Sequence, residues 1–306
     1  KEEIVLKTSG STGTPKRMRY AKQALVNSAL ATGDHFGVKI GDRALHCLSA
    51  DFIAGKMMLV RAMILGLELD IVPPNGNVLE GNTTVYDFAA MVPMQAVHAM
   101  NQINQVKTLL IGGAVPSTTL LHQLQSKKTN SFVTYGMTET LTHIASRSIK
   151  SNDAVYTVLP GVHITQDDRQ CLIIKVPYLT DADVVTNDVV TLASDVSFEL
   201  LGRVDHVINS GGVKIFPETV EQKIGSFIQP PFFITSIADE QLGQQVVLVL
   251  EQQKETQNLL NLLKEKKILS PYELPKKVFC LDAFKYTENG KLKREATTAK
   301  LVAHPY

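Results

Sequence analysis

The chain has little cysteine: Cys47, Cys171 and Cys280 are the only three among its 306 residues. These cysteines are odd in number, lie far apart and lack the spacing of a metal site. The pattern argues against a disulfide framework and predicts buried thiols in the reducing environment of the cytoplasm.

The sequence also lacks an excess of charge of either sign. It contains 31 lysine and arginine residues against 30 aspartate and glutamate residues, which leaves a formal net charge of +1. This balance provides no electrostatic reason to bind nucleic acid or an anionic membrane. We therefore expect small molecules as partners.

Long hydrophobic runs are absent as well. Apolar segments such as 56–69 are interrupted by charges, here Lys56, Arg61 and Glu68, and fall short of the length of a membrane helix. We find no signal peptide, internal repeat or low-complexity tract. With 44% hydrophobic residues, the chain is predicted to be globular, without a membrane span and large enough for two domains.

The centre of the chain has the order of a βαβ unit. The sequence predicts a strand over 106–111, a glycine turn at 112–114, a helix over 117–125 and a second strand over 131–134. Such a crossover indicates a parallel sheet, in which ligands bind beyond the carboxyl ends of the strands. Gly112 to Ala114 and Tyr135 to Thr140 occupy those positions.

The remainder of the chain predicts a different organisation. Residues 159–192 favour a small β-rich segment, and helices at 217–227 and 256–267 follow, with strands at 232–238 and 246–250 between them. The predicted fold class is α/β, with a mostly parallel sheet, βαβ units and the β-rich segment in a large N-terminal domain over 1–203. A small α+β C-terminal domain over 204–306 completes it.

A run of hydroxyl and glycine residues near the start of the chain ends in one lysine. Glycines let backbone N–H groups point into a common space, hydroxyls add donors and the lysine adds a charge, so the run is typical of a triphosphate loop. It differs from the ordinary nucleotide-binding loop, which ends in Gly-Lys-Ser/Thr, and a flexible polar linker is the alternative. The residues are Thr8, Ser9, Gly10, Ser11, Thr12, Gly13, Thr14, Pro15 and Lys16.

The segment after the second strand of the βαβ unit combines three chemical groups. The ring of Tyr135 can stack on a base, the Thr138 hydroxyl can donate to a phosphate, and Glu139 can hold a Mg²⁺ ion that bridges phosphate oxygens. Further along, Asp188 is suited to accept both hydroxyls of a ribose. Taken alone, each of these segments is by default an ordinary turn with its capping residue.

A longer pattern is far more specific. It runs through Gly202-Arg203-Val204-Asp205-His206 and Ser210-Gly211-Gly212 to Pro217, Glu218 and Glu221. Together with the motifs above and Glu288-Asn289-Gly290-Lys291 near the end, it resembles the superfamily of AMP-forming adenylating enzymes, which includes acyl-CoA and aryl-CoA ligases. The resemblance spans nearly the whole chain.

The resemblance implies a two-step reaction with ATP, Mg²⁺ and coenzyme A. A carboxylate attacks the α-phosphate of ATP, pyrophosphate leaves, and a thiol then displaces AMP from the acyl-adenylate. It also implies the residue roles. Thr8 to Gly13 and Lys16 cradle the β- and γ-phosphates, Glu139 holds magnesium, and Thr138 meets the α-phosphate. Gly112, Gly113, Ala114 and Tyr135 frame the adenine, Asp188 and Arg203 bind the ribose, and Lys291 carries adenylation.

By the same resemblance, Asp205 is the hinge about which the C-terminal domain turns between the two half-reactions. Lys291 occupies the site in the first pose, and Ser210, Gly211 and Gly212 approach the thioester-forming centre in the second. A solvated lysine in a basic tail and an ordinary glycine turn are the structural alternatives for these two motifs.

Within the superfamily, the chain looks most similar to short bacterial o-succinylbenzoate–CoA ligases of menaquinone biosynthesis. Such a site activates one carboxylate of an aromatic dicarboxylic acid and tolerates the other, for which Lys56, Arg61, Thr142 and His143 are candidates. Phe52 stands where many relatives have histidine, and with Gly136 and Met137 it is expected at the acyl pocket.

Several alternatives stay open. The substrate could be a fatty or simple aryl acid. The acceptor of the acyl group could be a free-standing carrier protein. A nucleotide-binding regulatory protein without catalytic activity is the alternative from a different functional class. Thr8 lies seven residues from the start, which fits either a short enzyme or one with an upstream subdomain. A homodimer is compatible with all of these.

Overall fold

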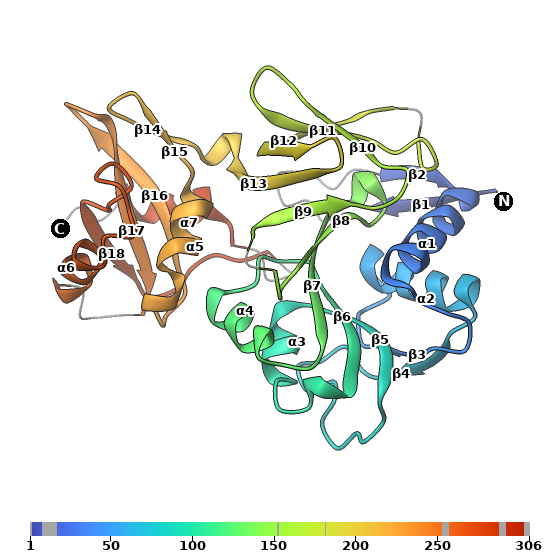
Figure 1. The fold of residues 1–306 in the computed structure, drawn as a ribbon. Helices are drawn as coiled ribbons and strands as arrows, with labels where there is room; N and C mark the ends of the chain where they lie inside the picture. The colour runs from blue at the N-terminus through green and yellow to red at the C-terminus, as the bar shows by residue number, and fades with distance from the viewer. Residues whose placement is uncertain are drawn as a thin grey trace. The chain divides into compact units, whose positions relative to one another are not determined.

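The computed structural model describes residues 2–7, 17–151, 153–180, 182–252, 257–287 and 292–302. The chain divides into two compact units (Figure 1). The first comprises Lys1–Thr186 and Val190–Leu200, and the second Asn187–Val189 and Leu201–Tyr306.

The first unit is built on an 11-stranded sheet in the order β10-β11-β12-β13-β9-β8-β7-β6-β5-β3-β4. Strands β4, β3, β5, β6 and β7 run parallel, whereas β7–β8, β8–β9, β9–β13 and β10–β11 pair antiparallel. The α/β prediction is confirmed, and the β-rich segment continues the parallel sheet. The elements from the start of the chain to the last strand of this sheet are β1 (Glu3–Lys7), β2 (Arg17–Ala21), α1 (Lys22–Phe36), β3 (Arg43–His46), α2 (Ile53–Leu65), β4 (Glu68–Ile71), β5 (Tyr86–Met91), α3 (Pro93–His98), η1 (Ile103–Gln105), β6 (Val106–Ile111), α4 (Thr118–Gln125), β7 (Asn130–Gly136), η2 (Thr138–Thr140), β8 (His143–Ser148), β9 (Val155–Val158), β10 (His163–Gln166), β11 (Cys171–Lys175), β12 (Val184–Ser194) and β13 (Ser197–Arg203).

Helices cover both faces of the parallel strands (Figure 1). Successive side chains of a strand point to opposite faces, so Leu109 packs in one cluster with Leu120 of α4, and Leu110 packs in another with Met58 of α2. This two-sided burial explains why consecutive residues at the carboxyl end of β6, Leu109 to Ile111, are all apolar and buried. The ends of α1 and α2 are set by Gly37 and Gly66 in the left-handed conformation.

The second unit is a smaller α+β domain, as predicted. Its five-stranded sheet has the order β15-β14-β17-β16, with β18 parallel to β17. Val220 of α5 and Leu263 of α6 pack in one cluster and Leu301 of α7 in another. The elements are η3 (Val204–His206), β14 (Ile208–Ser210), β15 (Val213–Ile215), α5 (Pro217–Ile224), η4 (Gly225–Phe227), β16 (Phe232–Asp239), β17 (Gly243–Glu251), α6 (Gln257–Lys266), β18 (Lys277–Leu281) and α7 (Arg294–Val302).

One expectation about the cysteines is wrong. Cys47 and Cys171 are buried, but Cys280 is exposed. Its neighbours Phe279 and Leu281 pack against the cluster around Phe284, and the alternation of a strand turns Cys280 the other way.

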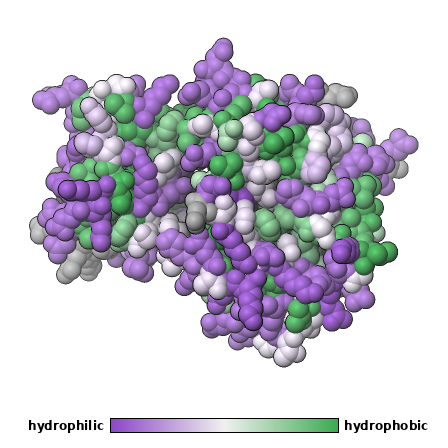
Figure 2. Space-filling model, in the orientation of Figure 1, coloured by the Kyte–Doolittle hydropathy of each residue, from purple (hydrophilic) through white to green (hydrophobic). Residues whose placement is uncertain are grey.

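The surface is mixed in character. Figure 2 shows hydrophilic groups interrupted by hydrophobic ones, among them those over α2, where Met63 is 74% exposed. None of the described helices is long and apolar enough to cross a membrane.

Candidate active site

Two glycine-containing turns lie side by side at the carboxyl edge of the parallel strands. Gly112 to Ala114 follow β6 and Tyr135-Gly136 end β7, and the two strands pair in parallel with Ile111 opposite Val133. Thr134 Oγ1 donates to the Ile111 carbonyl oxygen over 3.1 Å. Parallel pairing thus brings together the segments predicted to frame adenine.

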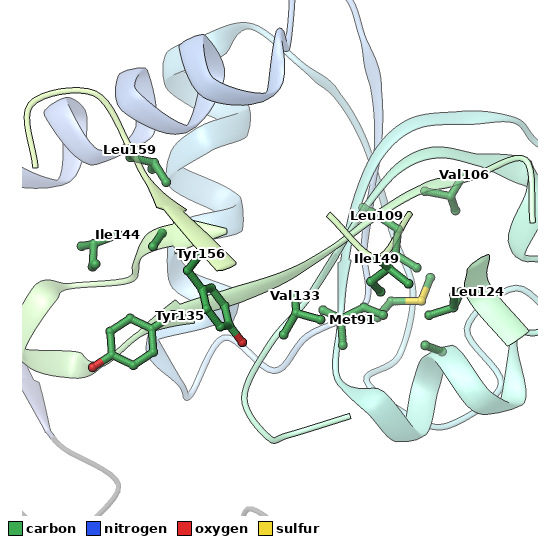
Figure 3. Close-up of a cluster of buried hydrophobic side chains, with 14 of the residues drawn as sticks. Met91, Val106, Leu109, Leu124, Val133, Tyr135, Ile144, Ile149, Tyr156 and Leu159 are labelled. Carbon is green, nitrogen blue, oxygen red and sulfur yellow. The ribbon is translucent and has the colours of Figure 1, made fainter. Parts of the chain in front are cut away.

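The ring of Tyr135 belongs to the core. It packs edge-to-face on Phe198, with ring centroids 5.3 Å apart, and lies 6.1 Å from the ring of Tyr156 (Figure 3). Only 9% of the residue is exposed. Most of this ring is therefore committed to packing, and little of its surface is open to a ligand.

Gly136 is required by a close approach. A Cβ atom at this position would lie 2.3 Å from the Thr142 carbonyl oxygen and 2.4 Å from the Cα atom of His143. Such distances leave no room for a side chain. The glycine therefore lets the turn after β7 fold back onto the start of β8.

The turn that carries Thr138 and Glu139 is fixed at both ends. Thr140 Oγ1 accepts from the Met137 N–H over 3.0 Å and donates to the Thr142 carbonyl oxygen over 2.8 Å. Leu141 has a φ of 66° and is fully buried, which is a strained conformation for leucine held by packing.

Tyr20 ties this turn to β2. Its hydroxyl donates to the Thr138 carbonyl oxygen over 2.7 Å. Burial, and then the negative charge of Glu139, raises the pKa of Tyr20 to about 12. Thr8 to Lys16 lie outside the described residues, but the flanking strands β1 and β2 pair antiparallel from Lys7 opposite Arg17 onward. The strands that flank the predicted phosphate loop thus contact the turn predicted to meet the α-phosphate.

A second polar cluster is buried between α1, α2 and β8. The residue at its centre is Arg61, which is 2% exposed. Its Nε donates to Thr32 Oγ1 over 3.3 Å, and its Nη2 donates to Thr142 Oγ1 over 3.1 Å and lies 3.5 Å from His143 Nδ1. Within the described ranges, Arg61 forms no ion pair with a carboxylate.

The hydrogen bonds assign the tautomer of His143. Thr32 Oγ1 donates to the Ser28 carbonyl oxygen over 2.9 Å, so it accepts from His143 Nε2 over 3.2 Å. Nδ1 then carries the lone pair that faces Arg61. Burial, followed by the charges of Arg61 and His35, holds the pKa of His143 well below its usual value. His143 is neutral, and Arg61 carries the positive charge of this cluster.

The other acyl-pocket candidates have different surroundings. Lys56 Nζ donates to the carbonyl oxygens of Ala50 over 2.5 Å and Asp51 over 2.9 Å. Phe52 is 47% exposed at the start of α2. Lys56 is engaged by the carbonyl oxygens of its own loop, whereas Arg61 is buried and hydrogen-bonds Thr32 and Thr142.

In the second unit, Arg203 contacts both Asp188, the other candidate ribose ligand, and Asp205, the candidate hinge residue. Its Nη1 lies 3.3 Å from Asp188 Oδ1, and its Nη2 donates to Asp205 Oδ2 over 2.9 Å. Burial raises the pKa of Asp205, but the hydrogen bond and charge of Arg203 outweigh this, and the net shift is downward. Asp188, Arg203 and Asp205 therefore form one charged group.

Ser210, Gly211 and Gly212 form the turn between β14 and β15. Ser210 pairs with Val213, and both glycines have positive φ, 59° and 81°, as a two-residue type I′ hairpin requires. Lys291 lies outside the described residues. On either side of it, Tyr286 pairs with Leu292, and the Lys293 N–H donates to the Lys285 carbonyl oxygen over 2.8 Å.

The sequence did not reveal three residues that hydrogen-bond to the predicted site residues and motifs. The sequence patterns assign no role to Tyr20, Thr32 or Arg294. Arg294 is bonded to Glu221 at 2.6 Å and 2.7 Å. Glu221 ends the pattern that begins at Gly202, and Arg294 follows Lys291 by three residues, so their places beside two specific motifs were the signal that could have paired them.

Comparison with known proteins identifies relatives of the whole arrangement. A profile of the family described as AMP-binding enzyme matches residues 4–171. An AMP-forming acyl-CoA synthetase/AMP-acid ligase II-like protein from Dyadobacter fermentans is 37% identical, and the alignment covers 98% of this chain and 90% of that one with a TM-score of 0.65.

More distant relatives carry a narrower name. The 2-succinylbenzoate–CoA ligase of Escherichia coli is 26% identical over 85% of this chain. The chain spans 60% of the length of that relative. The O-succinylbenzoate coenzyme A synthetase of Bacillus subtilis, in complex with ATP and magnesium ion, is 22% identical. The alignment covers 96% of this chain and 69% of that one, with a TM-score of 0.83. At this identity the likeness is one of fold.

Proposed function

The chain belongs to the AMP-binding enzyme family, and from this premise we propose that it is an AMP-forming acid–CoA ligase acting on o-succinylbenzoate. The observation that carries the substrate is the buried Arg61 guanidinium, which hydrogen-bonds only neutral groups within the described part of the chain.

A buried charge without a counter-charge is costly, because desolvation is not offset by attraction. Burial lowers the pKa of Arg61 to about 10, so the side chain still keeps its proton at neutral pH. A ligand carboxylate would supply the missing charge, with Thr142 Oγ1 as a neighbouring hydroxyl. A dicarboxylic acid has one carboxylate for this contact and a second for activation.

The names of the relatives point the same way. Several proteins aligned over most of this chain are 2-succinylbenzoate–CoA ligases, among them those of Escherichia coli and Lactococcus lactis. A solved relative from Bacillus subtilis is in complex with the acyl-adenylate intermediate OSB-AMP. We therefore propose o-succinylbenzoyl-CoA as the product, in menaquinone biosynthesis.

In the proposed first step, a carboxylate oxygen of the acid attacks the α-phosphorus of ATP, and the bond from that phosphorus to the β-phosphate bridging oxygen breaks. The products are the acyl-adenylate and pyrophosphate. Most of the catalysis is then positioning and stabilisation of charge. Thr8 to Gly13 and Lys16 would hold the β- and γ-phosphates, Thr138 the α-phosphate, and Lys291 the attacking carboxylate against it.

Glu139 suits the proposed magnesium site. It lies on the turn held by Tyr20 and forms no ion pair among the described residues. No cluster of three or more potential ligands occurs in the described ranges. Mg²⁺ is commonly bound through one or two carboxylates together with substrate phosphate oxygens. Bound there, Mg²⁺ would neutralise charge on the phosphates.

In the proposed second step, the thiol of coenzyme A loses its proton to solvent, its sulfur attacks the acyl carbonyl carbon, the bond from that carbon to the AMP oxygen breaks, and AMP leaves. We propose that the C-terminal domain, 204–306, turns about Asp205 between the steps, replacing Lys291 by the turn at Ser210 to Gly212. The bond from Arg203 to Asp205 supports this, since it links the proposed ribose ligand to the proposed hinge. Gly112 to Ala114 would line the adenine site, and Asp188 would accept the ribose hydroxyls.

The test is pyrophosphate release with ATP, magnesium and coenzyme A across four acids: o-succinylbenzoate, benzoate, a medium-chain fatty acid and an amino acid. We expect release with o-succinylbenzoate and formation of its thioester. Release with another acid alone would contradict the substrate, and release without thioester would indicate a different acceptor. No release with any of the four would contradict the proposed activity.

A further inference from the structure

A half-buried ion-pair network lies in the second unit, outside the residues that are proposed to meet nucleotide or acid. Arg294, the first residue of α7, donates from Nη1 to Glu221 Oε1 over 2.7 Å and from Nη2 to Glu221 Oε2 over 2.6 Å. Its Nη1 also donates to the Ile234 carbonyl oxygen over 3.1 Å, and its guanidinium lies 5.7 Å from the ring centre of Phe233. This bidentate geometry fixes the orientation of the guanidinium relative to the carboxylate as well as the distance between them.

Glu221 extends the contact to β16. It accepts from the Ile234 N–H over 2.7 Å as well as from Arg294. The carboxylate on α5 thus joins three elements: α5 itself, β16 and the start of α7. Burial lowers the pKa of Arg294, but the attraction of Glu221 outweighs it and raises the pKa overall.

One turn earlier on α5, Glu218 continues the network toward the proposed hinge. Its Oε1 lies 2.5 Å from His206 Nδ1 and 4.0 Å from Arg294 Nη2. His206 follows Asp205 directly. A Cβ atom at Gly202 would lie 2.5 Å from Glu218 Oε2, so the segment before the hinge packs tightly on the same carboxylate.

The other end of the network lies three residues from Lys291. Thr297, fully buried on α7, accepts from the Lys285 N–H over 3.1 Å and donates to the Lys293 carbonyl oxygen over 2.8 Å. Both chain ends that flank Lys291 are thereby bonded to α7. Arg294 in turn bonds α7 to α5.

We propose that Arg294, Glu221, Glu218 and His206 form a brace that positions the Lys291 segment relative to the hinge. The inference rests on the proposed function, in which Lys291 carries adenylation. Arg294 and Glu221 are positioning residues in it: they touch neither substrate nor reacting atoms. A lysine on a flexible stem gains its effect from placement, and small misplacements cost reactions heavily. The brace therefore serves the first half-reaction and not the second.

The experiment compares Arg294→Gln, Glu221→Gln and the double variant in the two half-reactions. We expect the kcat of adenylate formation to fall about ten- to a hundredfold and KM for ATP to stay within about twofold, because nucleotide contacts are untouched. Thioester formation from supplied acyl-adenylate stays within about twofold for the same reason. The double variant is no slower than either single one, because both remove the same pair.

The matched control is Glu273→Gln. Glu273 pairs with Lys223, also on α5, at 2.6 Å, and we expect both half-reactions to be unchanged. Arg294→Lys keeps the positive charge but cannot donate two parallel hydrogen bonds to one carboxylate. It should recover part of the adenylation rate that Arg294→Gln loses. Equal losses in both half-reactions, or losses in the double variant that multiply, would overturn the brace.

Amide exchange of α7 separates failure of the brace from failure of the proposed function. We expect faster exchange over 294–302 in Glu221→Gln than in the unaltered chain or in Glu273→Gln. Unchanged exchange overturns the brace even if the unaltered chain activates no tested acid. Normal adenylation by the variants, in a chain that is active and needs Lys291, overturns it while the proposed function stands.

Discussion

Arg61 Nη2 lies 3.1 Å from Thr142 Oγ1, and no carboxylate pairs with this arginine in the described part of the chain. Both residues are brought together by the packing of α2 against the turn before β8. Because His143 beside them is neutral, the cluster carries one uncompensated positive charge. In the proposed function, this charge is the group that would bind the second carboxylate of a dicarboxylic acid.

Replacing Lys291 by alanine should separate the two half-reactions. We expect adenylate formation to be abolished, because no other group is proposed to bridge the carboxylate and the α-phosphate, while thioester formation from supplied acyl-adenylate is largely spared. Pyrophosphate release and thioester formation are measured separately. Lys293→Ala, which changes an exposed neighbouring lysine, should leave both intact. Equal loss of both steps in Lys291→Ala would contradict the two-pose mechanism.

Asp188→Ala should weaken ATP binding about a hundredfold, since a carboxylate that accepts two hydroxyls contributes roughly 1.5 kcal/mol or more for each bond. The dissociation constant of ATP is measured by calorimetry. Asp183, an exposed carboxylate just before β12, provides the control as Asp183→Ala. An unchanged ATP affinity in Asp188→Ala would show that the ribose assignment is wrong.

The neutral state of His143 predicts a loss of stability in acid. Its pKa is low in the folded chain because burial, Arg61 and His35 disfavour the imidazolium, whereas in the unfolded chain it is about 6.5. Below that pH the unfolded state binds the extra proton, so the free energy of unfolding falls as the pH drops, by up to about 1.4 kcal/mol per pH unit.

Urea unfolding followed by circular dichroism between pH 7.5 and pH 5 measures this effect. The unaltered chain should lose more stability over that range than His143→Gln, in which the titrating group is gone. The comparison removes the contributions of all other groups, which are common to both proteins. Parallel pH profiles would mean that His143 is protonated in the folded state.

Local sequence patterns predicted the central strands and the helix between them, but not β2, α1, α2 or β8. The strand over 106–111 and the helix begun by Ser117 follow from an apolar run, a glycine turn and a capping residue, and the structure has them as β6 and α4. The parallel pairing of β6 and β7 then brought the two glycine-containing turns together, because carboxyl ends of parallel strands meet at one edge.

The sequence could not rank the cations of the acyl pocket. Lys56 and Arg61 lie five positions apart on one helix, and only the structure shows that Lys56 binds the carbonyl oxygens of its own loop while Arg61 is buried. The pair of Arg294 and Glu221 is separated by 73 residues, a distance over which no local pattern operates. Long-range packing, which single-sequence reasoning does not see, decides such contacts.

The most direct test of the dicarboxylate assignment compares kcat/KM for o-succinylbenzoate with that for monocarboxylate analogues that keep one or the other of its two carboxylates. The comparison is made in the unaltered chain, Arg61→Met and Arg61→Lys. Methionine fills a similar volume without the charge and is tolerated at buried sites.

We expect Arg61→Met to lose about a hundredfold in kcat/KM for o-succinylbenzoate, the value of a buried charge-assisted hydrogen bond, and Arg61→Lys to lose less. The kcat/KM for the monocarboxylate analogue that keeps the carboxylate attacked in the first step should change little between Arg61→Met and the unaltered chain. An equal loss for both acids in a folded Arg61→Met protein, or no loss for o-succinylbenzoate, would contradict the assignment of Arg61 as the group that binds the second carboxylate.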